Sequence, residues 1–202
     1  MQTMLEQGSG SVNLSIIVPA WNEVESLPEL IRRIGEHARA FEPYEIIVID
    51  DGSRDGSCEL LEKMCVVDPH LGFVSFGRNY GKSAALATAF ARLRGEIVIT
   101  MDADLQDDPA EIPRLIAELD NGWDLVSGWK RDRHDPLSKT IPSKFFNGVM
   151  RRVTGLKIHD FNCGLKAYRR EVVDSTKLYG ELHRFIPALS HWEGFQIGRA
   201  HV

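Results

Sequence analysis

The sequence predicts an α/β protein in which one mostly parallel sheet is flanked by helices. Two observations predict this fold class. Short apolar runs rich in Ile and Val alternate with stretches whose apolar residues recur at helical spacing, from about residue 14 to residue 127. Acidic and turn-forming residues follow several of the apolar runs. Strands that alternate with helices form βαβ units, in which the strands lie parallel and the crossovers are right-handed.

The first half of the chain contains three expected strand–helix pairs. The strands are short apolar runs of the kind buried in parallel sheets, at residues 14–19, 44–49 and 71–76. The helices that follow them are expected at about residues 27–41, 55–66 and 82–93. Ser26 and Glu29 have the spacing of a capping box, so we expect the Ser26 side chain to cap the first helix.

The second half continues the alternation as far as Gly128. Residues 97–101 form the next apolar strand, and 123–127 the one after it. Between them, Asp108 stands before Pro109 with Glu111 in the third helical position, a typical helix start. Further on, 160–168 are expected to return as a strand, 169–177 to form a helix and 183–187 to begin a last helical segment.

Length and composition indicate one ordinary domain. The chain has 202 residues, of which 43% are hydrophobic, enough for one core. We expect residues 1–13 to be a flexible tail and 14–196 to form the folded domain, truncated at its C-terminal end. The last six residues, IGRAHV, also match a translated sequencing adapter, so 197–202 are interpreted as a non-native tail.

Charge and cysteine content exclude some classes of function. The net charge is −5, which argues against a general nucleic-acid-binding surface. The three cysteines contain no CxxC pair and cannot all be bridged, which indicates a reducing compartment. The N-terminus lacks the pattern of a signal peptide, and no apolar run is long enough to span a bilayer.

A metal site is predicted after the strand at 97–101. Asp102, Asp104 and Gln106 follow it at alternate positions, so their oxygens point the same way if the chain stays extended. Ligands bind at the C-terminal ends of strands in open α/β sheets. Hard oxygen ligands suit Mg²⁺ or Mn²⁺, which bind one or two carboxylates together with substrate phosphates and water.

Three alternative interpretations of the acidic and glycine-rich loops fit the sequence less well. A plain helix-capping loop requires only Asp108 and leaves Asp102 and Asp104 unexplained. A P-loop needs four residues between its glycines, whereas Gly77 and Gly81 enclose three. The pair Asp102 and Asp104 also resembles the nucleophile motif of haloacid-dehalogenase-like phosphatases, but the residues after it differ and a helical cap is missing.

A nucleotide pocket is predicted beside the metal site. Pro19, Trp21 and Glu23 follow the first strand, while Asp50 and Asp51 follow the second. An aromatic face can stack on a base, and carboxylates can accept hydrogen bonds from base NH groups or ribose hydroxyls. Because the strands are parallel, both loops are expected at the edge that carries Asp102 and Asp104.

These motifs together resemble glycosyltransferase family 2, over about residues 14 to 195. The resemblance is carried, in order, by VPAWNE, IDDGSRDGS, GRNYGKSAAL, MDADLQDDP and DFNCGLKAYRR. The subgroup that these motifs resemble is the polyprenyl-phosphate (dolichol- or undecaprenyl-phosphate) sugar transferases. The resemblance implies a GT-A fold with a Rossmann-like sheet, a nucleotide-sugar donor and inversion at the sugar carbon.

The resemblance also implies roles for particular residues. It implies a metal held by Asp102, Asp104 and Gln106. It implies a nucleoside pocket with Trp21 in place of the usual Tyr, lined by Pro19, Trp21, Glu23, Asp50 and Asp51. Arg131 matches roughly the place of a cation near the phosphates, although Lys130 competes for that role; Lys82 and Arg184 are further candidates for binding phosphate.

The reaction expected is transfer of a hexose from a UDP- or GDP-sugar to a polyprenyl phosphate, with Mg²⁺ or Mn²⁺ as cofactor. A phosphate acceptor is already an anion, so no strong general base is needed; a sugar-hydroxyl acceptor would need one, and Asp160 is the candidate. Two other classes stay open, namely a metal-dependent phosphatase and a non-catalytic nucleotide-sugar-binding module.

A membrane partner is suggested by residues 141–153. Their apolar helical face is flanked by basic residues, namely Lys139, Lys144, Arg151 and Arg152. Such a helix can lie on an anionic membrane surface, although a core-packing helix with a basic solvent side is more common. We expect action at the cytoplasmic face of the membrane, with stable attachment supplied by a missing C-terminal segment.

Overall fold

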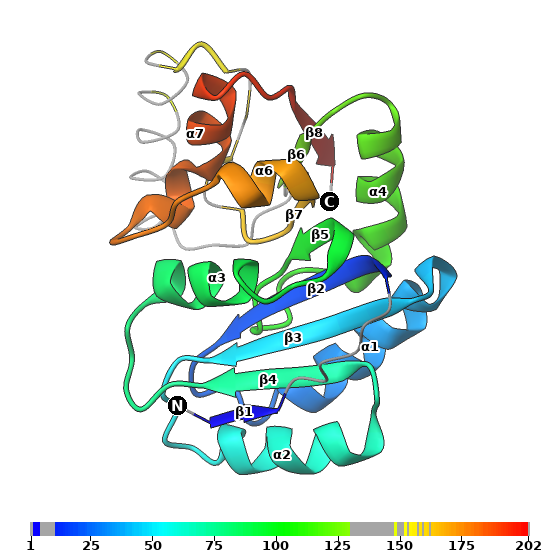
Figure 1. The fold of residues 1–202 in the computed structure, drawn as a ribbon, viewed down its shortest axis with the longest axis vertical. Coiled ribbons are helices and arrows are strands. Elements are labelled where there is room, and N and C mark those ends of the chain that lie inside the picture. The colour runs from blue at the N-terminus through cyan, green and yellow to red at the C-terminus, as the bar shows by residue number, and fades with distance from the viewer. Residues whose placement is uncertain are drawn as a thin grey trace.

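The computed structural model describes residues 2–4, 11–129, 148, 152, 154–156, 158, 160–161 and 163–201. These residues form one mixed sheet of eight strands in the order β1-β4-β3-β2-β5-β7-β6-β8 (Figure 1). The strands are β1 Gln2–Met4, β2 Val12–Ala20, β3 Tyr44–Asp50, β4 Leu71–Ser75, β5 Gly95–Thr100, β6 Leu125–Trp129, β7 Lys166–Arg169 and β8 Ile197–His201. The α/β prediction is confirmed.

Helices connect the strands in the expected alternation. The helices are α1 Leu27–Ala38, α2 Ser57–Val67, α3 Lys82–Phe90, α4 Ile112–Asp120, α6 Arg170–Ser175 and α7 Ile186–Trp192, with short 3₁₀ turns η1 Arg39–Phe41, η2 Pro109–Glu111 and η3 Leu182–Phe185. The predicted strands and helices of the first half agree with these bounds to within a few residues.

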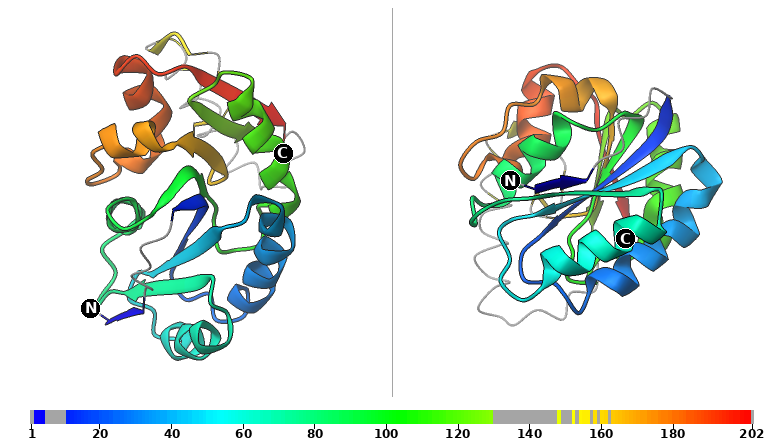
Figure 2. Two further views of the ribbon diagram at one scale, coloured as in Figure 1. Left: turned by 45° about the vertical axis from the view of Figure 1, so that its right-hand side comes forward. Right: turned by 60° about the horizontal axis from the view of Figure 1, so that its bottom comes forward.

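Helices cover both faces of the sheet (Figure 2). Ile16 and Val48 belong to the core on one side, against α1, α2 and α4, whereas Ile17 and Ile47 belong to the core on the other side, with α3, α6 and α7. Successive residues of a strand point to opposite faces, so a continuous apolar run fills two cores at once. This double burial explains why β2 and β3 lack a polar alternation.

Strand direction follows the prediction except at two strands. β2 pairs in parallel with β3 and β5, β3 with β4, and β6 with β8. β7 lies antiparallel between β5 and β6, and β1 lies antiparallel to β4. Residues 2–4 therefore form an edge strand within the tail that we expected to be flexible, and residues 197–201 form an edge strand beside β6.

The capping-box prediction at Ser26 is wrong. The Ser26 hydroxyl makes no capping bond to α1; it donates instead to the Glu23 carboxylate at 2.6 Å. The chain before α1 is already a turn, in which the Leu27 N–H donates to the Glu23 carbonyl at 3.0 Å. Since this turn satisfies the first donor of the helix, the Ser26 side chain is available to bind Glu23. At the other predicted cap, Asp108 does accept from the Ala110 N–H, at 2.9 Å.

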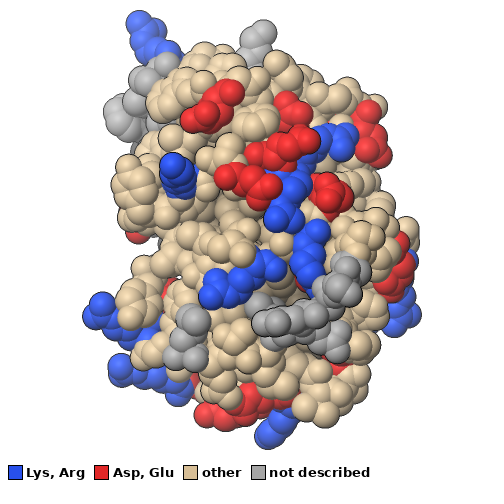
Figure 3. Space-filling model, in the orientation of Figure 1, with Lys and Arg blue, Asp and Glu red and all other residues tan. Residues whose placement is uncertain are grey.

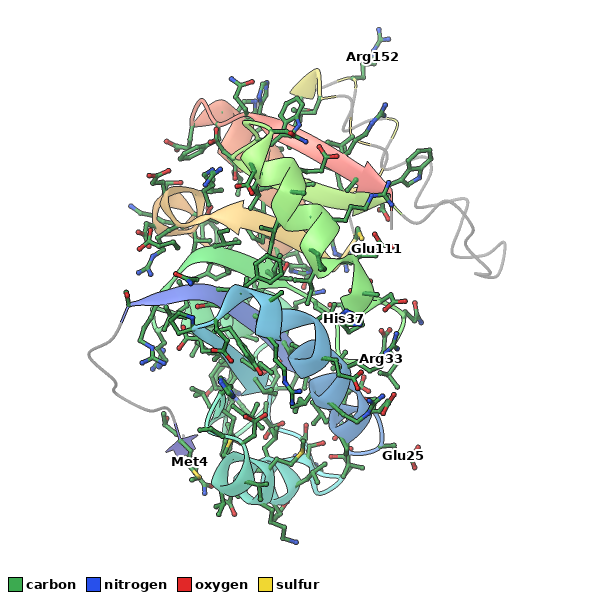
Figure 4. The ribbon with its side chains drawn as sticks, turned by 90° about the vertical axis from the view of Figure 1, so that its right-hand side faces the viewer. Met4, Glu25, Arg33, His37, Glu111 and Arg152 are labelled. Carbon is green, nitrogen blue, oxygen red and sulfur yellow. The ribbon has the colours of Figure 1, made fainter. Side chains whose placement is uncertain are left out.

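The surface carries charges of both signs, interspersed over the face seen in Figure 3. An ion pair links α1 to the start of η2: Arg33 reaches Asp108, with an N–O distance of 2.7 Å. Figure 4 shows Arg33 on α1, next to η2, which carries Glu111. Such an exposed pair is typically worth 1 kcal/mol or less, so its main effect is on orientation.

Candidate functional site

The C-terminal ends of β2, β3 and β5 meet at one edge of the sheet. Ala20 lies opposite Asp50, and Thr100 lies opposite Ile17, within the parallel register of the three strands. The Asp51 N–H donates to the Ala20 carbonyl at 2.8 Å, which extends the β2–β3 pairing into the loops. The polar loops that the sequence places after these strands are thus neighbours in space.

The acidic segment after β5 is a tight, self-bonded loop. The Asp102 N–H donates to a carboxylate oxygen of Asp107 at 3.1 Å, and Asp104 accepts from the Gln106 N–H at 3.1 Å. Leu105 has φ of 61°, a left-handed conformation that is uncommon outside glycine. Asp104 and Gln106 are exposed, whereas Asp107 is buried. The loop therefore presents the Asp104 and Gln106 side chains to solvent.

Asp102 lies among cationic groups. Lys82, the first residue of α3, donates from Nζ to the Asp102 carboxylate. Lys166 of β7 also interacts electrostatically with Asp102. Burial lowers the pKa of Lys166, and the carboxylates of Asp102 and Asp107 partly oppose that shift. Lys166 Nζ donates to the Cys163 carbonyl. The Asp102 side chain is 36% exposed, so it is held by protein on one side and accessible on the other.

Gly164 fixes how close the returning chain can come to Asp102. A Cβ atom at this position would lie 2.4 Å from one Asp102 carboxylate oxygen and 2.7 Å from the other. The Gly164 carbonyl accepts from Thr100 Oγ1 at 2.9 Å, which fixes this backbone against the end of β5. Only a residue without a side chain allows that approach, so Gly164 is part of the site's geometry.

The donor set at this edge fits a divalent cation. Asp102 and Asp104 supply hard, partly exposed carboxylate oxygens, and Asp102 already accepts from a cation in the structure. Among the described residues, no group of three or more His, Cys, Asp or Glu side chains is gathered as a metal cage. Mg²⁺ and Mn²⁺ in nucleotide enzymes commonly use one or two carboxylates, with phosphate oxygens and water completing the shell. The arrangement fits that mode of binding.

The loop after β2 presents an aromatic ring to solvent. Trp21 is 55% exposed, a high value for so large an apolar side chain. The loop itself is held in place, because the Asn22 N–H donates to Ser53 Oγ at 2.8 Å and the Asn22 carbonyl oxygen of the side chain accepts from the Arg54 N–H at 2.9 Å. A fixed backbone with an exposed indole can provide a stacking platform for a base.

The two neighbouring acids at the end of β3 are both buried but bind different partners. Asp50 is fully buried, and its carboxylate accepts from Ser75 Oγ at 2.7 Å and from the Ser53 N–H at 3.0 Å. Asp51 accepts from two successive backbone N–H groups, of Tyr80 at 2.7 Å and Gly81 at 2.8 Å. Asp50 therefore holds β3 to β4, while Asp51 orients the loop that leads into α3 and Lys82.

Close packing of the two loops depends on Gly52. Its φ of 74° is left-handed, and a Cβ atom there would lie 2.3 Å from the carbonyl carbon of Arg78. Glycine satisfies both requirements, since it lacks a Cβ atom and adopts positive φ readily. The turn at residues 50–53 therefore packs against the loop 77–81, which brings the ends of β3 and β4 together.

Several predicted residues lie at the margin of this site or outside the described residues. Asp160 is buried, and its backbone carbonyl accepts from Ser127 Oγ at 3.3 Å. Arg184 is exposed, and one of its guanidinium nitrogens lies 3.4 Å from a carboxylate oxygen of Glu181. Pro19 and Glu23 are partly buried near Trp21. Outside the described residues lie Lys130, Arg131, Lys139, Lys144 and Arg151, together with most of the predicted membrane-surface helix at 141–153; Arg152 is described and exposed.

Sequence reasoning missed four residues that the fold brings to the site: Ser83, Gly164, Lys166 and His183. Ser83 is buried under η3, where its hydroxyl contacts His183. Gly164 and Lys166 belong to the DFNCGLKAYRR motif, and the glycine and lysine of this motif could have indicated both residues from the sequence. His183 follows no strand and carries no local signal, since its partner is distant in sequence.

Comparisons with known proteins identify a family and named relatives. Residues 15–176 match the model of the family described as Glycosyl transferase family 2. The chain is 43% identical over 180 residues to an undecaprenyl-phosphate 4-deoxy-4-formamido-L-arabinose transferase of Pseudomonas fluorescens, covering 88% of this chain and 53% of that protein. A protein of the same name from Salmonella paratyphi B is 42% identical, with 88% and 55% covered. The chain thus spans about half the length of the curated relatives it matches.

Solved structures of similar fold are more distant in sequence. Glucosyl-3-phosphoglycerate synthase from Mycobacterium tuberculosis, crystallised with Mn²⁺ and UDP-glucose, superimposes with a TM-score of 0.73 at 22% identity, covering 94% of this chain and 69% of that one. Mannosyl-3-phosphoglycerate synthase from Rubrobacter xylanophilus gives a TM-score of 0.74 at 18% identity, covering 95% and 66%. At these identities the likeness establishes the fold.

Proposed function

Because this chain belongs to glycosyl transferase family 2, we propose that it moves a sugar from a nucleotide-sugar donor to a polyprenyl phosphate, with inversion at the sugar carbon. The observation that carries the proposal is the strand-end cluster of Asp102, Asp104 and Lys82, with the exposed Trp21 on the neighbouring loop. It combines hard metal ligands, a cation and a stacking surface at the edge where α/β sheets bind ligands.

The donor is a UDP- or GDP-hexose in this proposal. Trp21 stacks on the base, and Asp51 with the partly buried Pro19 and Glu23 lines the nucleoside side of the pocket. Asp50 supports them from the core. Asp102, Asp104 and Gln106 would hold Mg²⁺ or Mn²⁺, which when bound neutralises charge on the leaving diphosphate. Lys82 lies next to Asp102 and would bind a phosphate oxygen of the same diphosphate.

The acceptor is proposed to be an undecaprenyl-type lipid phosphate. The relatives at 42% and 43% identity are named for transfer to undecaprenyl phosphate, which supports this choice. A phosphate oxygen is already anionic at neutral pH and needs no base to deprotonate it. A reaction that needs no base agrees with the burial of Asp160, the one residue predicted as a base for a hydroxyl acceptor. Arg131 would assist at the phosphates.

The same relatives favour a second donor sugar. Their names specify 4-deoxy-4-formamido-L-arabinose, a pentose derivative, whereas the sequence motifs led us to expect a hexose. The residues described at the site are proposed to bind the base and the diphosphate, and these two groups are the same whichever sugar the donor carries. We therefore extend the proposal to a nucleotide-linked formamido-pentose as a donor to be tested beside the hexoses.

The setting proposed for this reaction is the cytoplasmic face of a membrane. No helix among the described residues is both long and apolar enough to cross a bilayer. The basic segment around residues 139–152 would contact anionic head groups.

The test is to incubate the protein with UDP- or GDP-sugars, Mg²⁺ and a short-chain polyprenyl phosphate, and to measure lipid-linked sugar. We expect transfer to the lipid phosphate with at least one donor. Asp120→Asn, a substitution of an exposed acid of α4, serves as the matched control for site variants. Release of inorganic phosphate without lipid-linked sugar would identify a phosphatase instead. Donor binding without turnover, or transfer only to a sugar hydroxyl, would also reject the proposal.

A further inference from the structure

A histidine from the last third of the chain is bound to the start of α3. His183 of η3 and Ser83 of α3, which are 100 residues apart, make two contacts: the His183 N–H donates to Ser83 Oγ at 3.1 Å, and His183 Nδ1 lies 2.9 Å from the same oxygen. Ser83 is 1% exposed, so this contact is sheltered from water. The neighbour of Ser83 in sequence is Lys82, which reaches Asp102.

The two contacts determine which nitrogen of His183 carries its proton. A backbone N–H can only donate, so Ser83 Oγ accepts that bond with a lone pair. Among the described residues, His183 Nδ1 is the one acceptor within hydrogen-bond distance of the buried Ser83 hydroxyl, so the hydroxyl proton is assigned to this contact, with Nδ1 as its acceptor. A neutral imidazole that accepts at Nδ1 carries its hydrogen at Nε2. The geometry therefore orients His183 as an Nε2–H donor.

The charges around the ring keep it neutral. Burial lowers the pKa of His183 to about 4, and the cations Lys82, Arg184 and Lys166 act in the same direction, opposed by Glu181. Three cations within electrostatic reach of one neutral donor form a local environment that favours an anion. Lys82 already pairs with Asp102, and Arg184 lies near Glu181, so the positive field is only partly compensated.

Within the part of the chain that the structure describes, no residue accepts a hydrogen bond from His183 Nε2. Resting on the glycosyltransfer proposed above, we propose that His183 is a substrate-binding residue whose Nε2–H donates to a phosphate oxygen, either of the donor diphosphate or of the acceptor lipid phosphate. Because the ring is neutral, it adds direction without adding a further charge to a site that already contains Lys82 and Lys166. Ser83 is the positioning residue that fixes the ring.

A purely structural role explains less of the geometry. A structural contact that holds η3 against α3 requires only the His183 backbone N–H and an acceptor at Nδ1. An asparagine side chain would provide the same acceptor. The Nε2 atom contributes nothing to such a structural contact. The two roles can therefore be separated by side chains that preserve one ring position each.

Nuclear magnetic resonance of the ring nitrogens tests the inference without turnover. We would label the histidines of the full chain with ¹⁵N, assign His183 with the His183→Asn variant, and add Mg²⁺ with either UDP or a short-chain polyprenyl phosphate. We expect the Nε2–H tautomer in the free protein and a saturable shift of the Nε2–H signal with one of the two probes, which identifies the source of the phosphate. Exposed His191 serves as the internal control and should not shift.

Two variants then separate binding from structure in the transfer assay. His183→Asn keeps the acceptor for Ser83 but loses the distal donor, and should lower kcat/KM roughly 10- to 100-fold, as expected for a hydrogen bond to a charged group. His183→Gln places an N–H where Nε2 lies and should recover most of that loss. Both variants should retain the melting temperature of the wild type to within a few degrees.

The outcomes are distinguishable from failure of the proposed function. If the wild type transfers no sugar but the Nε2–H signal responds to UDP or lipid phosphate, the function is wrong and the role of His183 stands. An Nδ1–H tautomer, or an Nε2–H signal that neither probe shifts, would overturn the role of His183 whatever the transfer assay shows. Equal activity of His183→Asn and wild type would overturn it as well.

Discussion

Replacing Gly164 with alanine should damage the proposed metal–phosphate site while leaving the fold almost intact. The new Cβ would lie 2.4 Å from an Asp102 carboxylate oxygen, whereas ordinary contacts begin at 3.4 Å, so the carboxylate must move by about 3.4 − 2.4 = 1.0 Å. Asp102 is partly exposed and its side chain can rotate toward solvent. The cost to folding is therefore expected to be small, about 1 kcal/mol, below the usual cost of overpacking a closed core.

The same displacement should be expensive for activity. A misplacement of about 1 Å in a catalytic or positioning group can reduce turnover about 10²-fold. We expect Gly164→Ala to lower kcat/KM by roughly that factor and to weaken binding of Mn²⁺ with UDP. Isothermal titration calorimetry, the transfer assay and a thermal melt measure the three quantities.

Two glycines provide matched controls for this variant. A Cβ at Gly77 would have no atom within 4 Å, so Gly77→Ala should be neutral in all three measurements. A Cβ at Gly95 would lie 2.6 Å from the backbone nitrogen of Ser15, which cannot rotate away, so Gly95→Ala should lose stability first. If Gly164→Ala binds metal and turns over within threefold of wild type, the close approach of Gly164 does not set the position of Asp102.

Three other predictions follow from the site. Asp104→Asn should reduce metal-dependent turnover roughly 10²- to 10³-fold, as for loss of one preorganised charge stabiliser; full activity of this variant in excess chelator would contradict the metal assignment. Trp21→Ala should weaken donor binding by about 1–3 kcal/mol, the usual contribution of a stacked base, and unchanged calorimetric affinity in a folded variant would place the base elsewhere. The His183 pKa of about 4 lies below its ordinary 6.5, so unfolding takes up a proton between these values and stability should fall as pH decreases from 6.5 to 4. Because the ring is only partly buried, we expect a loss of about 1–3 kcal/mol, measured by urea unfolding at both pH values; a slope that persists unchanged in His183→Gln would refute the assignment to this ring.

The family and the predicted fold class were accessible from the sequence because both depend on local patterns. Apolar runs such as that of β2 report burial on two faces, and burial on two faces is a property of parallel sheets covered by helices. Asp108 and Pro109 start η2 by local capping chemistry, and the structure has that contact. The acidic motif after β5 predicts hard oxygen ligands through residue type and spacing alone, and the metal site stays a prediction.

Tertiary structure decided what depends on contacts between distant residues. The sequence could not reveal that β7 runs antiparallel between β5 and β6, since direction in a sheet is set by the path of the connecting chain. Nor could it separate Asp50 from Asp51, which are adjacent and chemically identical. Both are buried, and only the positions of Ser75 and Gly81 bind one to β4 and the other to the loop before α3.

The same limit applies to Ser26 and to His183. The Ser26 capping pattern was correct as a local preference, but the Glu23 turn satisfied the helix first and the hydroxyl bonded elsewhere. His183 lies 100 residues from Ser83, and no periodicity or spacing rule connects residues so far apart. Local sequence determines which side chains can bind metal, base or phosphate, whereas the packing of η3 on α3 decides that an imidazole stands beside Lys82, because that contact exists only after the chain has folded.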